Sequence, residues 1–222
     1  MPHAIIAPHA GYIYSGRTAA HAFAALHSGR SASRRVVVIG PAHYVAVRGI
    51  AVPTADAFET PLGRVPVDRG AVADMADLPF VVTADAPHAP EHALEVELPF
   101  LQAVLGSFTL VPLLVGDAAP EQVSQALGRI WDEALIVVSS DLSHFLDYDT
   151  ARRRDAATAA AIERGDWALL GPADACGFLP IAGLLVQAGQ RGLKAERLAL
   201  CNSGDTAGSR DRVVGYGAWA FA

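Results

Sequence analysis

Short runs of β-branched and other apolar residues alternate along this chain with longer Ala- and Leu-rich stretches of helical periodicity. This feature restricts the fold most strongly, because it is typical of layered α/β proteins in which helices cover a central sheet. The strands are predicted at residues 4–7, 35–40, 48–53, 79–83, 108–115, 134–139, 197–201 and 213–221. The helices are predicted at residues 15–26, 68–77, 91–105, 120–131, 149–164 and 179–189, with Ser15, Asp68, Pro120 and Asp149 as start signals.

Several of these strands are continuously apolar rather than alternating, which is typical of strands buried on both faces of a parallel sheet. The segment 48–66 departs from the alternation of helix and strand, so the sheet is expected to be mostly parallel or mixed. No internal repeat or Pro/Ser-rich linker occurs, although the turn-rich stretch 171–177 is a place where a domain boundary could lie. We therefore predict a single α/β domain over residues 1–222.

The composition excludes several classes of function. Of the 222 residues, 52% are apolar and 18% are charged, below the roughly 25% charged of typical soluble domains, so a large core is expected. The net charge is −6, and no Lys/Arg run or aromatic-basic stripe suggests binding to nucleic acid or an anionic membrane. No apolar run approaches the ~18 residues of a membrane span.

The chain contains two cysteines, Cys176 and Cys201, without CxxC spacing. Two cysteines are too few for a disulfide framework, so a reducing cytoplasm is the expected location. The expected partner is a small molecule or another protein.

Three histidines follow predicted buried strands. His9 and His43 come shortly after the first two strands, and His144 follows the strand at 134–139. Ligands of α/β sheets bind beyond the carboxyl ends of the strands, so these three imidazoles are expected to meet in one region. Together they predict a metal site with His9 and His43 as the first two ligands. A hydrogen-bonded loop histidine is the alternative for each one alone.

His92 is a further candidate for the same pocket, because it opens a predicted helix that also carries Glu91 and Glu95. Carboxylates near a helix N-terminus are favoured electrostatically, and residues four apart share one helix face. The alternative is a capping carboxylate with a solvated acidic face. The remaining histidines, which have no comparable context, are assigned to the surface or to packing: His3, His21, His27 and His88.

The third metal ligand is expected in the segment that follows the strand ending at Cys201. Asp205 is the hard oxygen ligand available there, and Cys201 is the soft alternative. Two histidines and one carboxylate would favour non-heme iron and leave coordination positions open, whereas a cysteine would shift the preference towards copper or zinc. The segment 202–209 also has the composition of an ordinary turn.

A hydrolase is the weaker enzyme class. Ser139, Ser140, Asp141 and His144 supply the residue types of a nucleophilic triad. However, no GxSxG elbow surrounds either serine, and one short loop leaves no evident way for His144 to bridge Ser and Asp.

Five ordered motifs resemble those of the MEMO family, the protein B type of the AmmeMemoRadiSam system. They are Ala7-Pro8-His9-Ala10-Gly11-Tyr12, Gly40-Pro41-Ala42-His43, Glu91-His92-Ala93-Leu94-Glu95, Ser139-Ser140-Asp141-Leu142-Ser143-His144 and Val213-Val214-Gly215-Tyr216. The resemblance implies a three-layer α/β/α, LigB-like domain similar to the catalytic subunits of class III extradiol dioxygenases, which open catechol rings with Fe(II).

The resemblance also implies roles for individual residues. His9 and His43 match the metal histidines, His144 matches the proton-transfer histidine, and His92 faces the pocket. Animal members carry a cysteine before the closing Tyr motif, and an ungapped match places it at Thr206, next to Asp205. In microbes the family is associated with AMMECR-type and radical SAM proteins, which are therefore expected partners.

The sequence thus predicts a metal-dependent, dioxygenase-like oxidoreductase, with Fe(II) as the expected cofactor and Cu or Zn as alternatives. His144 would move protons between oxygen and a small hydroxylated substrate, and an aromatic one would suit a pocket wall with Tyr12, Tyr14 and Tyr44. The competing hypothesis is a non-catalytic protein that uses the pocket to bind a ligand or a peptide. A homodimer is the default expectation for the oligomeric state.

Overall fold

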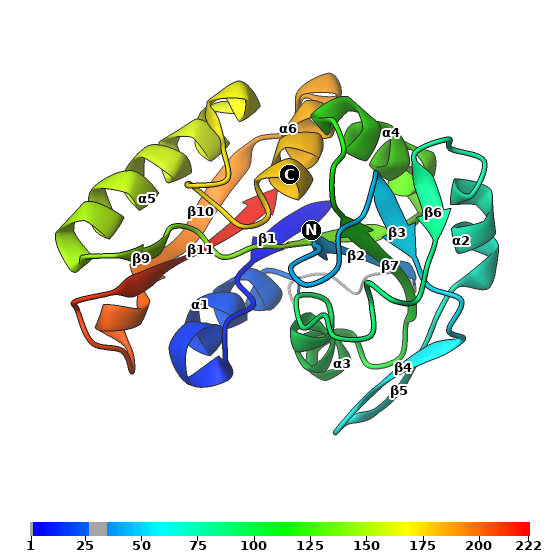
Figure 1. Ribbon diagram of the computed structural model, residues 1–222, viewed down its shortest axis with the longest axis horizontal. Coiled ribbons are helices and arrows are strands. Elements are labelled where there is room, and N and C mark those ends of the chain that lie inside the picture. The colour runs from blue at the N-terminus through cyan, green and yellow to red at the C-terminus, as the bar shows by residue number, and fades with distance from the viewer. Residues whose placement is uncertain (1, 27–34) are drawn as a thin grey trace.

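A mixed sheet of nine strands runs through the computed structural model, which describes residues 2–26 and 35–222 (Figure 1). The strands, apart from a separate hairpin, are β1 (Ala4–Ala7), β2 (Arg35–Pro41), β3 (Ile50–Val52), β6 (Val81–Thr83), β7 (Thr109–Val115), β8 (Leu135–Ser139), β9 (His144–Leu146), β10 (Ala195–Asn202) and β11 (Val213–Phe221). Their order is β10-β11-β1-β8-β2-β7-β3-β6, and β9 pairs with β11. All eight strands predicted from the sequence are present.

The four central strands, β1, β8, β2 and β7, are parallel to one another. Antiparallel pairs flank them, because β11 pairs antiparallel with β1 on one side and β3 with β7 on the other. The sheet is therefore mixed. Because the central strands run the same way, their carboxyl ends meet at one edge, where the segments after β1, β2 and β8 leave the sheet.

Helices cover both faces of the sheet, which makes three layers (Figure 1). They are α1 (Tyr12–Ala24), α2 (Arg69–Met75), α3 (Leu98–Leu105), α4 (Pro120–Ile130), α5 (Tyr148–Arg164) and α6 (Phe178–Arg191). The apolar side chains of α1 and α3 pack with one set of strand residues, and those of α2, α4, α5 and α6 pack with the other. Neighbouring residues of each strand face opposite layers: Ile5 and Val137 join the first core, and Ile6 and Val138 join the second. The predicted three-layer α/β/α fold is confirmed.

Three strands, in two separate parts of the chain, were not predicted from the sequence. One part is the hairpin of β4 (Ala57–Thr60) and β5 (Gly63–Pro66), which lies apart from the main sheet in the irregular 48–66 segment. The other is β9, which is only three residues long and largely exposed, so it carries no apolar pattern. Among the described residues, none of the helices is both long enough and apolar enough to cross a membrane.

Several helix starts differ from the predictions. The helix predicted from residue 91 begins at Leu98, after turns and the 3₁₀ segment η1 (Glu95–Glu97). Helix α1 begins at Tyr12, three residues before the predicted start at Ser15. The Ser15 hydroxyl does not cap the helix but donates a 2.8 Å hydrogen bond to the Ala10 carbonyl. Asp147, not Asp149, caps α5, whereas Asp68 caps α2 as predicted, accepting a 3.0 Å bond from the Ala71 N–H.

Candidate metal centre

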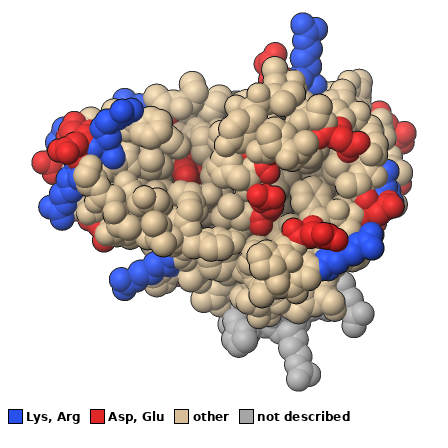
Figure 2. All heavy atoms as spheres, turned by 60° about the horizontal axis from the view of Figure 1, so that its bottom comes forward, with Lys and Arg blue, Asp and Glu red and all other residues tan. Residues whose placement is uncertain are grey.

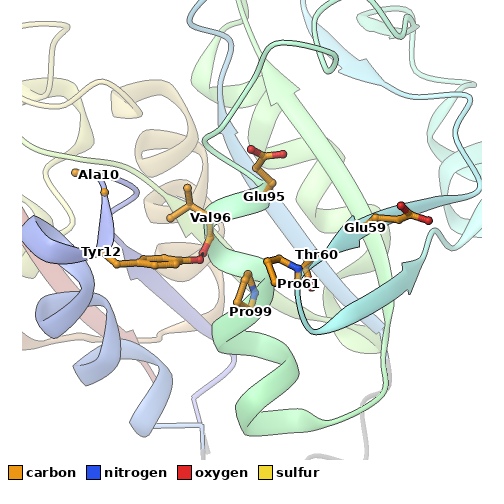
Figure 3. Close-up of a pocket in the computed structure, with 9 residues that line it drawn as sticks. Ala10, Tyr12, Glu59, Thr60, Pro61, Glu95, Val96 and Pro99 are labelled. Atoms are coloured by element: carbon orange, nitrogen blue, oxygen red, sulfur yellow. Dashed lines mark hydrogen bonds between the residues drawn. The ribbon is translucent and has the colours of Figure 1, made fainter.

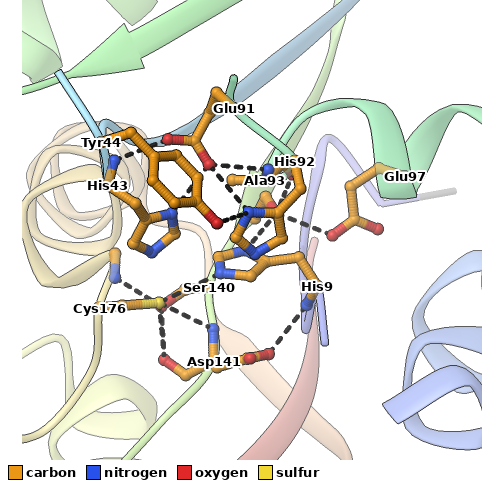
Figure 4. A network of polar contacts seen from close by, with 12 residues as sticks. His9, His43, Tyr44, Glu91, His92, Ala93, Glu97, Ser140, Asp141 and Cys176 are labelled. Carbon is orange, nitrogen blue, oxygen red and sulfur yellow. Dashed lines mark hydrogen bonds and ion pairs between the residues drawn. The ribbon is translucent and has the colours of Figure 1, made fainter. Parts of the chain in front are cut away.

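Three histidines from separate parts of the chain meet at the carboxyl edge of the parallel strands (Figure 4). His9 follows β1, His43 follows β2, and His92 lies in the turns before η1. The ring centroids of His9 and His43 are 5.2 Å apart, and that of His92 lies 5.4 Å from His9 and 5.1 Å from His43. Imidazoles this close together can share one ion.

His9 is fixed from two sides and is 2% exposed. Its backbone N–H donates a 2.9 Å hydrogen bond to Asp141 Oδ1, and its ring Nδ1 lies 2.7 Å from Ser139 Oγ. Burial, followed by the neighbouring His43 and His92, holds the pKa of His9 well below its ordinary value. The ring is therefore neutral at pH 7, the form that binds metals.

Cys176 completes a group with His9 and His43 in which the ligand atoms lie within 4.8 Å of one another. Its Sγ lies 3.3 Å from His9 Nε2 and accepts a 3.3 Å bond from the Asp141 N–H. Burial raises the pKa of this thiol to about 12, so it is protonated without a metal, and a bound cation would deprotonate it.

Glu91 orients the second imidazole. Its Oε2 accepts a 2.6 Å bond from the His43 backbone N–H, and its Oε1 lies 2.9 Å from His43 Nδ1. Although burial raises the pKa of Glu91, the hydrogen bonds from His43 outweigh it and lower the pKa to about 2. Glu91, His43 and His92 form a second group with ligand spacing, but Glu91 occupies the Nδ1 side of His43 and leaves Nε2 available. The solvated acidic face considered from sequence does not describe Glu91, which is 6% exposed.

His144 lies in β9, is exposed, and belongs to neither group with ligand spacing among the described residues. Desolvation lowers its pKa, and so does the charge of His43. The next residue, Phe145, has a φ of 61°, which is uncommon for a residue other than glycine. The Phe145 ring packs edge-on to the His144 ring, with the two centroids 5.6 Å apart. Arg212 Cζ lies 4.9 Å from the Phe145 ring centroid.

The residues expected to supply the third ligand do not belong to either group. Asp205 is exposed, and its carboxylate accepts bonds from the Tyr148 hydroxyl at 2.5 Å and the Asn202 N–H at 3.1 Å. Cys201 Sγ lies 3.0 Å from Thr18 Oγ1. Among the described residues, the groups with ligand spacing contain Cys176 or Glu91, and neither Asp205 nor Cys201. Cys176 was not predicted from the sequence because it follows no strand.

The two serines at the end of β8, Ser139 and Ser140, do not form a nucleophilic triad with His144. Ser139 is fully buried and contacts His9, not His144. Ser140 donates a 2.8 Å bond to the Asp141 carbonyl and accepts a 2.9 Å bond from the Gly177 N–H. Both hydroxyls therefore serve to hold the site together.

The four other histidines have no place in the two groups. His3 and His21 are exposed, and His88 Nε2 lies 3.2 Å from the Ala51 carbonyl, which fits their assignment to surface or packing. His27 lies outside the described residues.

A cavity of about 270 Å³ lies between the start of α1, the turn from β4 to β5, and η1 (Figure 3). Its wall includes Ala10, which follows His9, and its lining is Ala10, Gly11, Tyr12, Glu59, Thr60, Pro61, Glu95, Val96 and Pro99. The Tyr12 hydroxyl donates a 3.0 Å hydrogen bond to the Val96 carbonyl, which joins two parts of the cavity wall. Figure 2 shows carboxylates toward the middle of one face and Lys and Arg side chains near its margins.

These features define a three-layer α/β/α protein with three histidines and a cysteine at the carboxyl edge of its parallel strands. A family described as Memo-like protein matches residues 1–220. A MEMO1 family protein from Thermoplasma volcanium is 33% identical, covering 97% of this chain and 84% of its own. Another, from Aeropyrum pernix, is 36% identical, covering 96% and 81%. The chain therefore belongs to the Memo-like family, and the resemblance seen in its motifs is confirmed.

A solved structure agrees on the fold. The crystal structure of an uncharacterized protein from Escherichia coli K12 matches with a TM-score of 0.64 and covers 97% of this chain and 98% of its own. Its sequence is 15% identical, so the match concerns the fold alone.

Proposed function

We propose that this chain is a metal-dependent oxidoreductase whose ion is held by His9, His43 and Cys176. The observation that carries the proposal is the 3.3 Å contact between His9 Nε2 and Cys176 Sγ, within a group whose ligand atoms lie within 4.8 Å of one another. Both histidines bind a protein group through Nδ1, Ser139 for His9 and Glu91 for His43. This arrangement leaves both Nε2 atoms for a metal, as is usual for metal-binding histidines.

The donor set bears on which metal fits. With a carboxylate as third ligand, Fe(II) would be the first choice, but a thiolate with two imidazoles shifts the preference towards copper or zinc. Zinc has no redox chemistry. An oxidoreductase built on this site would therefore use copper, with iron as the alternative, and the bound ion would supply one-electron redox chemistry.

The other residues of the site would act on the substrate. His144 lies at the exposed side with a lowered pKa, so it is neutral at pH 7 and can accept a proton there. His92 Nδ1 lies within hydrogen-bond distance of the Tyr44 hydroxyl, 3.3 Å away. The adjoining cavity offers Tyr12 as a flat wall for a small, aromatic substrate.

Metal binding to the apo protein tests the proposal. We expect anaerobically prepared protein to bind about one copper or iron ion per chain. The variants His9→Ala, His43→Ala and Cys176→Ser should each lose most of this affinity, whereas the matched variant Cys201→Ser should keep it. A wild-type protein that binds none of these ions, or a Cys176→Ser variant that binds as tightly as wild type, would refute the proposed site.

The role of His144 needs a separate measurement. His144→Ala should keep the metal and abolish oxygen consumption with a hydroxylated aromatic substrate. Loss of the metal from this variant would show that the division between ligands and proton-transfer group is wrong.

Exposed aromatic side chains around the site favour a second candidate, a non-catalytic binding protein. Tyr12 is 51% exposed, and Tyr44 and Phe145 are each 61% exposed. Such a rim suits a ligand or a protein partner, for which AMMECR-type and radical SAM proteins are the candidates. Purified protein that binds such a partner equally well with and without metal, and consumes no oxygen, would favour this function.

A further inference from the structure

The hydroxyl of Ser139 is saturated with contacts at the end of β8. Its Oγ lies 2.7 Å from His9 Nδ1, 2.6 Å from the Ala93 carbonyl oxygen and 2.9 Å from Glu97 Oε1. Ser139 and Glu97 are both 0% exposed. A serine hydroxyl has one proton to donate and two lone pairs to accept with, so three partners use all of its capacity.

Counting protons fixes which group donates in each contact. Two of the contacts join oxygen to oxygen at hydrogen-bond distance, and each needs a proton between its atoms. The Ala93 carbonyl has no proton, so the single Ser139 proton must lie in that contact. The proton between Ser139 Oγ and Glu97 Oε1 must then come from Glu97, which is therefore a neutral carboxylic acid.

The last partner follows from the same count. With its own proton given to Ala93 and one lone pair accepting from Glu97, Ser139 Oγ can only accept from His9 Nδ1. His9 is then the tautomer with a proton on Nδ1, and its bare Nε2 faces Cys176 Sγ at 3.3 Å. We infer that Glu97, as a buried neutral acid acting through Ser139, is a positioning residue that fixes His9 in its metal-binding tautomer. The metal-binding purpose of this tautomer rests on the proposed function.

The surroundings of Glu97 agree with a neutral side chain. Its second oxygen, Oε2, is buried and has no hydrogen-bond partner among the described residues, a costly position for a charged carboxylate. Burial raises the pKa of Glu97 well above its ordinary value, and the negative charge of Asp141 raises it further. The 3₁₀ segment η1 turns Glu97 inward while Glu95 stays exposed, so the acidic stretch has two different environments.

Infrared spectroscopy of metal-free protein labelled with ¹³C-glutamate tests the protonation of Glu97 directly. At neutral pH we expect one label-sensitive carbonyl band of a protonated acid, which should disappear in Glu97→Gln. The ring ¹⁵N shifts of His9 should show a protonated Nδ1 and a bare Nε2. Wild-type protein without the protonated-acid band, or with its His9 proton on Nε2, would overturn the inference. The wild-type spectra decide this even where a variant fails to fold.

Metal affinity then tests the positioning role. Glu97→Gln can still donate an amide hydrogen to Ser139 Oγ, so it should bind metal within a few-fold of wild type. Ser139→Ala removes the acceptor for Nδ1–H, so His9 should become a mixture of tautomers and metal affinity should fall by roughly 10- to 100-fold. An unchanged tautomer in Ser139→Ala would refute the role. Wild-type protein with the expected spectra but without metal binding would instead refute only the proposed function.

Discussion

Gly177 gives a direct test of how the site is assembled, because it packs against the end of β8 next to Cys176. A Cβ added at Gly177 would lie 2.7 Å from Ser140 Cβ and 2.9 Å from the Ser139 carbonyl oxygen. Its backbone has a φ of −94°, which any residue adopts, so the cost of Gly177→Ala is steric and not conformational. The Ser139 carbonyl belongs to a central strand and cannot move aside.

The size of the effect follows from this overlap. Overpacking in a well-packed interior typically costs about 1–3 kcal/mol. For a domain of this size, each kcal/mol lowers Tm by roughly 2–4 °C. To relieve the overlap, the start of α6 would shift away from β8 and move Cys176 Sγ away from His9 Nε2. Metal affinity should therefore fall at least about tenfold.

Gly189→Ala is the matched control in the same helix. Gly189 is exposed, and an added Cβ would have no neighbour within 4 Å. This substitution should stabilise the protein by about 0.5–1 kcal/mol and leave metal affinity unchanged. Urea unfolding and metal titration measure both variants. If Gly177→Ala is as stable as wild type and binds metal equally well, the close contact between α6 and the end of β8 does not hold Cys176 in place.

Three further predictions concern single groups. The pKa of the Cys176 thiol is about 12 without metal, so metal binding should release about one proton from it between pH 6 and 8. The apparent metal affinity should therefore rise about tenfold per pH unit. Calorimetry in buffers of different ionisation enthalpy should find that Cys176→Ser releases one proton fewer on metal binding than wild type. Burial raises the pKa of Asp155 from 3.8 to about 6, so the native state holds a proton that the unfolded state releases, and stability should fall as the pH rises from 3.8 to about 6. Asp155→Asn should remove about 3 kcal/mol of that fall, measured by urea unfolding across this range, and an unchanged pH dependence would contradict the raised pKa. Asp205→Ala should leave metal content unchanged, measured on purified protein, since this carboxylate binds Tyr148 and Asn202; lost metal would restore Asp205 as a ligand.

The fold could be predicted from the sequence because its strands are nearly continuous apolar runs. Strands such as 35–41 and 109–115 are buried along almost their whole length, which is the environment that such runs require. Helix starts were less predictable, since a capping residue type such as Ser15 can instead donate to a carbonyl that precedes the helix. The strand β9 is short and exposed, so its pairing with β11 depends on tertiary contacts.

The candidate site was predictable to the extent that strands position it. His9 and His43 could be found because a parallel sheet brings the residues that follow its strands to one edge, whatever their separation along the chain. Cys176 follows no strand and precedes α6, so its position depends on how closely that helix approaches the end of β8. The sequence feature that indicates this close approach is the pair Cys176-Gly177, because a glycine next to a possible ligand lets the backbone pack tightly against another segment.

This difference explains why the structure groups His9 and His43 with the thiol of Cys176 and not with the carboxylate of Asp205. The third ligand was expected after another strand, where Asp205 is the acidic residue available. In the structure, Asp141 joins the two parts of the site: its carboxylate accepts from the His9 N–H, and its own N–H donates to Cys176 Sγ. The segment that follows β8 therefore fixes the distance between His9 and Cys176. A ligand set assembled this way depends on backbone contacts between three segments, which residue types alone do not reveal.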